Sequence, residues 1–196
     1  MNLFYLFQAK RDRGTQTAKD PVACETEKLT FDIVYFNLGK RSASPSDDEV
    51  VKCLRNCVQL IMEKHSYTLN GMMSRIHLDE RTDLQSGFAE LSDEIFGSGT
   101  QVSWSRIVTF FAFGARLAQY CVEHQMNELV IDVVAIMSSL AVDRLTPFVR
   151  DHGGWVSVVY IYIFFWTKYP KNPKCILIFC EVRIKENIFP FLGHIV

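Results

Sequence analysis

Apolar residues recur at helical spacing along most of the chain, with short polar breaks between the apolar segments. In the first segment, residues 25–40, Leu29, Ile33 and Phe36 lie three or four positions apart. The same segment is rich in β-branched and aromatic residues, so a strand remains an open alternative there. Gly39 and the polar run KRSASPSDDE predict that this element ends and that a linker follows.

Two amphipathic helices are predicted next. The cluster Ser46-Asp47-Asp48-Glu49 suits a helix N-terminus, where side-chain oxygens cap free N–H groups and negative charge is favoured. An apolar stripe of period near 3.6 follows, and it also carries His65; its apolar members are Val50, Leu54, Val58, Ile61 and Leu69. A histidine on such a stripe is more often a packing residue than a catalytic one. Gly71 loosens this helix, and the run IHLDERTD predicts a break.

The segment from Asp83 to Phe96 has apolar residues in register for a third amphipathic helix. The run GSGT at 97–100 follows it. A phosphate-binding loop would normally follow a strand and carry more glycines. Because a helical pattern comes first here, a turn is the favoured interpretation.

The two segments that follow, 102–120 and 127–145, are apolar on most sides, which predicts two central helices wrapped by amphipathic ones. Ser103 is placed to cap the first of them. Arg106 lies near its start, where an unpaired buried guanidinium would be costly. Pro147 suits the first turn of a further helix and Gly153-Gly154 its end. The later apolar runs VSVVYIYIFFW and CILIFC are shorter than the ~18 residues that cross a bilayer.

Composition narrows the class of protein. The chain has 196 residues, enough for one domain with a core, and its net charge of −1 gives no electrostatic case for nucleic-acid binding. It shows no signal-peptide pattern, so we expect an intracellular protein. Cys53 and Cys57 lie on one helical face, but no further ligand pair accompanies them, so buried packing is favoured over a metal site. We expect no cofactor.

Two motifs together resemble a known family. SWSRIVTFFAFGARLA, which contains Trp104 and Arg106, resembles the first homology motif of the B-cell lymphoma 2 (Bcl) family of apoptosis regulators, Asn-Trp-Gly-Arg-Ile-Val. DRLTPFVRDHGGW, which ends at Trp155, resembles that family's second homology motif. EKLTFDIVYFNL looks like the family's N-terminal helix, and the stretch 51–78 is similar to its second helix. The resemblance covers about residues 25–165, in the family's order and spacing.

The resemblance implies an all-α fold: a Bcl-like bundle of about eight helices around a central hydrophobic helical hairpin, with a surface groove. The groove would receive the amphipathic death-motif helix of a pro-apoptotic relative, whose aspartate pairs with Arg106. Arginine suits this role because its guanidinium binds a carboxylate through two hydrogen bonds. The matching groove residues are Trp104, Arg106, Ile61, His65, Leu69, Met72, Leu91, Ile95, Val108, Phe113 and Tyr162. For the apolar ones, groove and core are equally open interpretations.

The chain departs from the family pattern at two places. Ser103 and Ser105 replace the Asn and Gly beside the motif tryptophan. Val58 and Gln59 replace the Gly-Asp of the third homology motif, which a death-motif helix needs for close approach and for pairing with arginine. The helix that carries them is therefore a poor ligand for other family members, and the tail after about Trp166 resembles nothing in the family.

Three functions compete at this point. The first is a prosurvival-type regulator that binds death-motif helices and also pairs with family members. The second is a Bax/Bak-like effector that permeabilises the mitochondrial outer membrane. The third is an unrelated helical enzyme that uses His124, Asp132, His152 or Cys121, although no nucleophile and base stand at a recognisable spacing. We therefore expect no enzyme.

We also expect three parts along the chain. These are a loose arm at 1–23, a Bcl-like helical domain at 24–166 and an atypical tail at 167–196. The expected location is the cytoplasm, with peripheral association at the mitochondrial outer membrane.

Overall fold

The computed structural model describes residues 20–40, 48–76, 81–97 and 102–168, and these ranges contain helices joined by turns, with no strand. The helical alternative for the first segment is therefore confirmed. The helices are α2 (Pro21–Asn37), α3 (Glu49–Lys64), α4 (Ser66–Met73), α5 (Arg81–Phe96), α6 (Trp104–Glu123), α7 (Leu129–Asp151) and α8 (Val156–Lys168). Within the described part no helix combines the length and the apolar character needed to cross a membrane.

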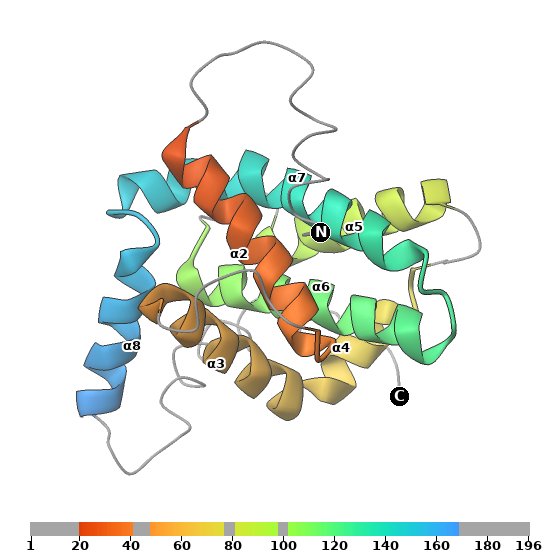
Figure 1. Cartoon of the computed structure of the whole chain (residues 1–196), viewed down its shortest axis with the longest axis horizontal. Helices are drawn as coiled ribbons and strands as arrows, with labels where there is room; N and C mark the ends of the chain where they lie inside the picture. The colour runs from red at the N-terminus through yellow and green to blue at the C-terminus, as the bar shows by residue number, and fades with distance from the viewer. Residues whose placement is uncertain (1–19, 41–47, 77–80, 98–101, 169–196) are drawn as a thin grey trace.

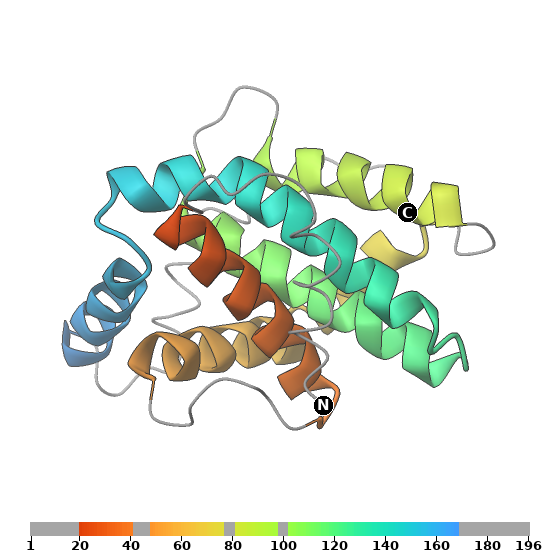
Figure 2. The ribbon, with the colours of Figure 1, turned by 45° about the horizontal axis from the view of Figure 1, so that its top comes forward.

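Helices α6 and α7 form the central hairpin and lie side by side through the middle of the bundle (Figure 2). Of the 20 residues of α6, 15 are buried, which confirms a core helix rather than an amphipathic surface helix. The two helices approach closely at Gly114, where an added Cβ would lie 2.3 Å from Met137 Sδ. A side chain larger than that of glycine at this position would therefore require Met137 to shift.

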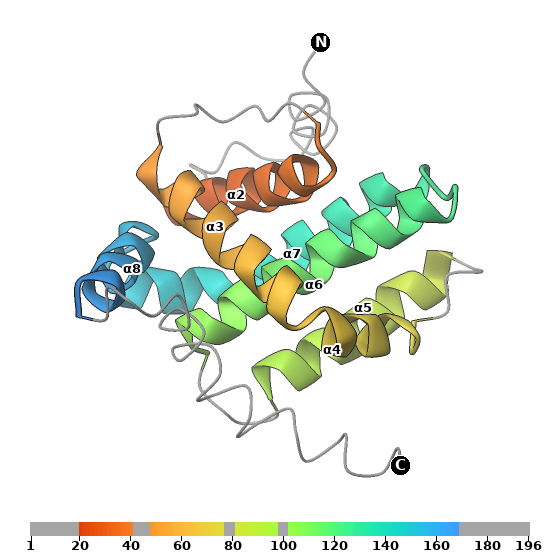
Figure 3. The same cartoon turned by 90° about the horizontal axis from the view of Figure 1, so that it is seen from below.

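The other helices wrap this hairpin. Helix α2 crosses α6 and α7 and contacts both (Figure 1). Helix α3 packs against α6 and α2, whereas α5 packs against α6 and α7. Helix α8 contacts α3 at one end of the bundle, and α4 and α5 lie toward the other end (Figure 3). Of the helices that carry the predicted groove residues, α3, α4 and α5 thus contact α6, and α8 contacts α3.

Three helices begin with side-chain caps, which satisfy backbone N–H groups that lack a partner within the helix. Asp48 accepts hydrogen bonds from the backbone of Val50 and Val51 at 2.9 and 3.3 Å, as the acidic cluster predicts. Ser103 accepts from the backbone N–H of Arg106 at 3.5 Å, which confirms its predicted capping role. Asp20 caps α2, and Gly153 and Gly154, both at positive φ, follow the end of α7.

The structure moves two predicted boundaries. Helix α2 begins at Pro21, so residues 21–23, which the sequence assigned to the arm, are helical. Proline has no backbone N–H, but the N–H groups in the first turn of a helix have no acceptor within the helix, so proline is tolerated there. The predicted second helix is broken at His65, which separates α3 from α4. Ser66, Thr68 and Asn70 have low helix propensity and favour such a break.

Pro147 was predicted to start a helix, and this prediction was wrong, because Pro147 lies inside α7. Leu145 and Val149 on either side of it are fully buried, whereas the proline itself is exposed. Burial of this face in the core therefore outweighs the cost of the lost backbone hydrogen bond. The arm up to residue 19, most of the GSGT turn and the run CILIFC lie outside the described residues.

Candidate functional site

The start of α6 carries the two motif residues around which the predicted site is built. Trp104 is the first residue of α6, and Arg106 lies in the same turn. Ser103 and Ser105, the two departures from the family pattern, are 3.0 Å apart through their hydroxyl oxygens. One hydroxyl therefore donates to the other, which satisfies part of the hydrogen-bonding need of the half-buried Ser103 and the buried Ser105.

Arg106 is only 7% exposed, and its guanidinium donates a hydrogen bond to the backbone carbonyl of Phe96. Phe96 ends α5, where carbonyl groups lack helical partners and the helix dipole favours a positive charge. Arg106 thus links the end of α5 to the start of α6. The guanidinium that was expected to pair with a partner's aspartate thus already donates to an acceptor within the protein. A guanidinium has five N–H donors, and Phe96 accepts one of them.

An aromatic cluster joins the two homology motifs in space. The ring of Trp104 lies 5.9 Å from that of Trp155 and 5.4 Å from that of Phe148, both in edge-on geometry. Trp155 is nearly fully buried, and its indole N–H donates to the Thr26 hydroxyl of α2 at 3.0 Å. A buried indole needs such a partner. The two motifs, which are far apart in the sequence, are therefore in direct contact through their tryptophans.

The apolar candidates come from α6 and from three helices that contact it. Each of the following is at most 8% exposed: Ile61 of α3, Leu69 and Met72 of α4, Leu91 and Ile95 of α5, and Val108 and Phe113 of α6. Phe113 lies 5.3 Å from the ring of Phe88 on α5. Of the two open interpretations for these residues, their burial fits the core. To line a groove, these residues would have to become accessible through movement of the side chains or helices that now bury them.

The two remaining candidates are partly buried. His65 lies between α3 and α4. Tyr162 of α8 faces α3, and burial raises the pKa of its phenol, with a further rise from the nearby thiols of Cys57 and Cys53. A hydrogen bond with Asn56 lowers the same pKa. Tyr162 therefore belongs to the contact between α8 and α3.

The residues of the enzyme hypothesis are not assembled into a site. His124 follows α6 and His152 follows α7, so the length of α7, about 34 Å, separates them. Each ring contacts the backbone carbonyl four positions earlier. Cys121 is fully buried, and burial, with a smaller contribution from Glu128, raises the pKa of its thiol to about 11. A neutral thiol is a poor nucleophile.

Cys53 and Cys57 are buried on the face of α3 that meets α8. The Cys53 thiol lies 3.8 Å from the carbonyl oxygen of Val158. Across the described ranges, no group of three or more His, Cys, Asp or Glu residues is arranged to hold a metal ion. The two cysteines contribute to the packing of α3 against α8.

Several charged contacts around the candidate site were not predicted. Arg55 of α3 binds Asp32 of α2 through two hydrogen bonds of 2.7 and 2.8 Å, and this aspartate is 1% exposed. Arg75 binds Glu94 of α5 in the same bidentate way. The sequence offers one signal for these pairs, namely that each is an arginine and a carboxylate on separate amphipathic segments, and that signal does not fix the partner.

A sequence model described as apoptosis regulator proteins of the Bcl-2 family matches residues 54–155. The chain belongs to the Bcl-2 family. Bcl-2-like protein 1 of Gallus gallus is 32% identical over 114 residues, which cover 58% of this chain and 48% of that protein. The Homo sapiens protein of the same name is 32% identical over 113 residues, covering 58% and 47%.

Apoptosis regulator R1 of Xenopus laevis is 27% identical over 139 residues, covering 68% of this chain and 60% of that protein. The chain spans about half the length of the first relatives named above. The residues matched by the Bcl-2 family model include both tryptophan motifs and almost all of α3 through α7. The family description is that of regulators of apoptosis.

Proposed function

We propose that this Bcl-2 family member is a prosurvival-type regulator of apoptosis. It binds the amphipathic death-motif helix of a pro-apoptotic relative in a groove beside α6, and it can pair with other family members. It acts in the cytoplasm and associates peripherally with the mitochondrial outer membrane. The observation that carries the proposal is Arg106, which lies in its family motif where α5 meets α6.

The chemistry of this position supports the proposal. Apolar side chains of α4 and α5 pack around α6, and Arg106 brings a positive charge to the start of this helix. An amphipathic partner helix offers matching apolar residues and one carboxylate. In contrast, α3 is unsuited to act as such a ligand, because Val58 is fully buried and Gln59 replaces the acidic residue.

Calorimetric titration with a panel of death-motif peptides tests the proposal. The unmodified protein is expected to bind at least one peptide, and Arg106→Ala to weaken that binding about 10- to 150-fold, as for a hydrogen-bonded charged pair of about 1.5–3 kcal/mol. Arg150→Ala, an exposed arginine on α7, serves as the control and should bind as the unmodified protein does.

Because Arg106 also contacts Phe96, the loss could reflect a disturbed α5 end. A double-mutant cycle separates the two causes: peptide Asp→Ala should have no further effect on Arg106→Ala if the two groups pair directly. Absence of binding at high micromolar peptide would contradict the proposal. Release of contents from mitochondrial-lipid liposomes after peptide addition would instead indicate the effector branch.

A further inference from the structure

Asn70 and Gly71 of α4 form the only asparagine–glycine pair in the sequence. In such a pair the backbone nitrogen of glycine readily approaches the side-chain carbonyl carbon of asparagine, because glycine has no Cβ to obstruct it. Both residues are exposed, and a Cβ added to Gly71 would meet no neighbouring atom within 4 Å. Neither burial nor packing therefore shields this amide from a reaction with its own backbone and with water.

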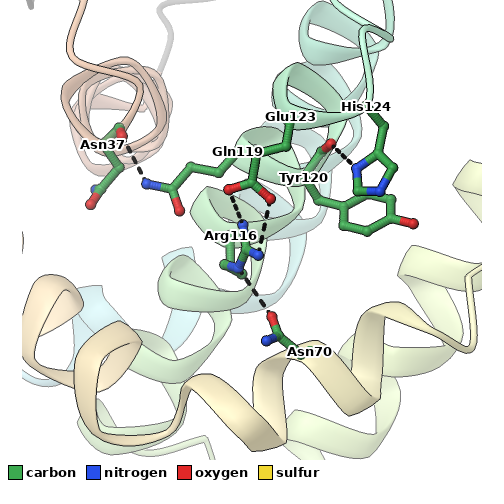
Figure 4. A network of polar contacts seen from close by, with 7 residues as sticks. All are labelled: Asn37, Asn70, Arg116, Gln119, Tyr120, Glu123 and His124. Atoms are coloured by element: carbon green, nitrogen blue, oxygen red, sulfur yellow. Dashed lines mark hydrogen bonds and ion pairs between the residues drawn. The ribbon is translucent and has the colours of Figure 1, made fainter.

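The Asn70 side chain is oriented by α6 (Figure 4). Arg116 of α6 donates from Nε to Asn70 Oδ1 at 3.1 Å. Because a guanidinium only donates, the oxygen of the amide faces it. Glu123 accepts hydrogen bonds from both terminal nitrogens of the same guanidinium, at 2.9 and 3.1 Å, whereas Gln119 donates to the Asn37 carbonyl of α2. Asn70 is thus a neutral acceptor for a guanidinium that already binds one carboxylate.

The backbone around Gly71 is held only weakly in its helical form. Within a helix each N–H points along the axis to the carbonyl four positions earlier, so an attack by the Gly71 nitrogen needs local unwinding. Helix α4 has 8 residues, and its N-cap residue His65 makes no side-chain cap hydrogen bond. Ser66, Thr68 and Gly71 have lower helix propensity than alanine, and a helix this short does not form alone in water. Brief unwinding of this turn is therefore the step that permits the reaction.

We propose that Asn70 is a site of spontaneous deamidation, in which Gly71 and water convert its side-chain amide to a carboxylate. In the first step the Gly71 nitrogen attacks Asn70 Cγ and closes a succinimide ring. The Cγ–Nδ2 bond breaks, and Nδ2 leaves as ammonia with the proton that the Gly71 nitrogen gives up. Water then adds to either ring carbonyl and opens the ring, which leaves aspartate or isoaspartate. No electrons are exchanged with an oxidant or a reductant.

Both products change the contact between α4 and α6. Each places a new carboxylate on α4, and the net charge of the chain falls from −1 to −2, since one neutral side chain becomes negative. In the aspartate form, the hydrogen bond from Arg116 becomes an ion pair beside Glu123. In the isoaspartate form, the main chain runs through the former side-chain carbon. The added methylene breaks the regular hydrogen-bond spacing, so α4 is interrupted at this position.

Peptide mapping by mass spectrometry tests the proposal in the full-length protein, incubated at neutral pH and physiological temperature. Trypsin releases residues 65–75 as one peptide, in which Asn70 is the only side-chain amide. Acid should accumulate in this peptide at a rate that does not depend on protein concentration, and chromatography separates the aspartate and isoaspartate forms. A sample digested before incubation corrects for conversion during digestion. The proposal is wrong if residue 70 remains an amide when the free synthetic peptide 65–75 has converted fully.

Two variants test the succinimide route. Gly71→Ala should slow the conversion by about 5-fold or more, because alanine favours the helix by about this factor and its Cβ obstructs the attack. Asn70→Gln keeps an amide at this position but lengthens the side chain by a methylene, so its peptide should gain no acid. Conversion of Gly71→Ala at the rate of the original protein would contradict this route.

Asn37 of α2 is the matched control within the same molecule. It donates from Nδ2 to the Ile33 carbonyl at 2.8 Å, and Leu38 follows it instead of a glycine. Asn37 should therefore remain an amide over the same incubation. Equal conversion of Asn37 and Asn70 would overturn the proposal, because the glycine and the weak helix would then have no influence.

The effect on α4 is measured on the modified molecules, which native anion-exchange chromatography isolates by their added negative charge. Hydrogen exchange followed on the isoaspartate-containing peptide should approach the rate of an unfolded chain, while exchange within α6 stays as in the original protein. Unchanged exchange within α4 would contradict the inferred interruption of this helix. No peptide ligand enters these measurements, so their outcome is independent of the test of the proposed function.

Discussion

Helices α6 and α7 approach each other closely at Gly114. An alanine Cβ there would lie 2.3 Å from Met137 Sδ and 3.0 Å from its Cε. We expect Gly114→Ala to lower the free energy of unfolding by about 1–3 kcal/mol, as overpacked cores do. Urea denaturation measures the loss. In the double variant Gly114→Ala/Met137→Ala the shorter opposing side chain should relieve the clash. The double variant should therefore lose less stability than the sum of the two single variants, and strictly additive losses would contradict this account.

Cys121 predicts a specific pH dependence of stability. Burial raises the pKa of its thiol from 9.0 to about 11, so the folded protein keeps a proton that the unfolded chain loses first. The contribution is present below pH 9 and is lost as pH rises from about 9 to 11. Between pH 8 and pH 10 it amounts to about 1 kcal/mol. Denaturation at both pH values should show a smaller alkaline loss for Cys121→Ala than for the unmodified protein.

Single residues also show where prediction from sequence ends. Trp104 and Arg106 were identifiable from their motif, and Ser103 and Asp48 from the chemistry of helix caps. The acceptor of Arg106 was not, because a backbone carbonyl such as that of Phe96 has no signature in the sequence. Pro147 was misplaced because local propensity was weighed without the core that Leu145 and Val149 bury.

At the scale of helices, the buried ion pair between Asp32 and Arg55 fastens α2 to α3. The guanidinium also lies over the ring of Phe36, 4.4 Å from its centroid. We expect Arg55→Ala to destabilise the protein by about 3–5 kcal/mol, because it leaves the Asp32 carboxylate buried without this partner. Thermal unfolding followed by circular dichroism measures this change. Lys52→Ala, which removes an exposed pair on the same helix, should change stability by at most about 0.5 kcal/mol.

The helical periodicity of the sequence predicted most helices but not how they pair. The apolar stripes of α3, α5 and α6 were readable because burial on one face or all round dictates the spacing of apolar residues. The partners of Arg55 and Arg75, and the Asn70 partner of Arg116, depend on how separate helices are rotated and shifted against one another. No spacing within one helix encodes that arrangement.

At the scale of the whole molecule, the described contacts define where an autonomous domain should begin. Asp20 caps α2 and also pairs with Arg150 of α7. We expect a fragment of residues 20–168 to unfold cooperatively, and a fragment of residues 24–168 to be less stable by about 1–2 kcal/mol through loss of the cap and the pair. Urea denaturation of the two fragments compares them. Equal stability would show that the boundary at 24 suffices.

The edge-on tryptophans have an optical consequence. The rings of Trp104 and Trp155 are 5.9 Å apart with their planes inclined at 65°. Two identical chromophores this close and this inclined share their excited states, so the ultraviolet circular dichroism of the protein should contain paired bands of opposite sign. Replacing either tryptophan with phenylalanine should abolish the pair of bands. The protein thus carries a label-free spectroscopic gauge of whether its two homology motifs stay docked while a partner binds.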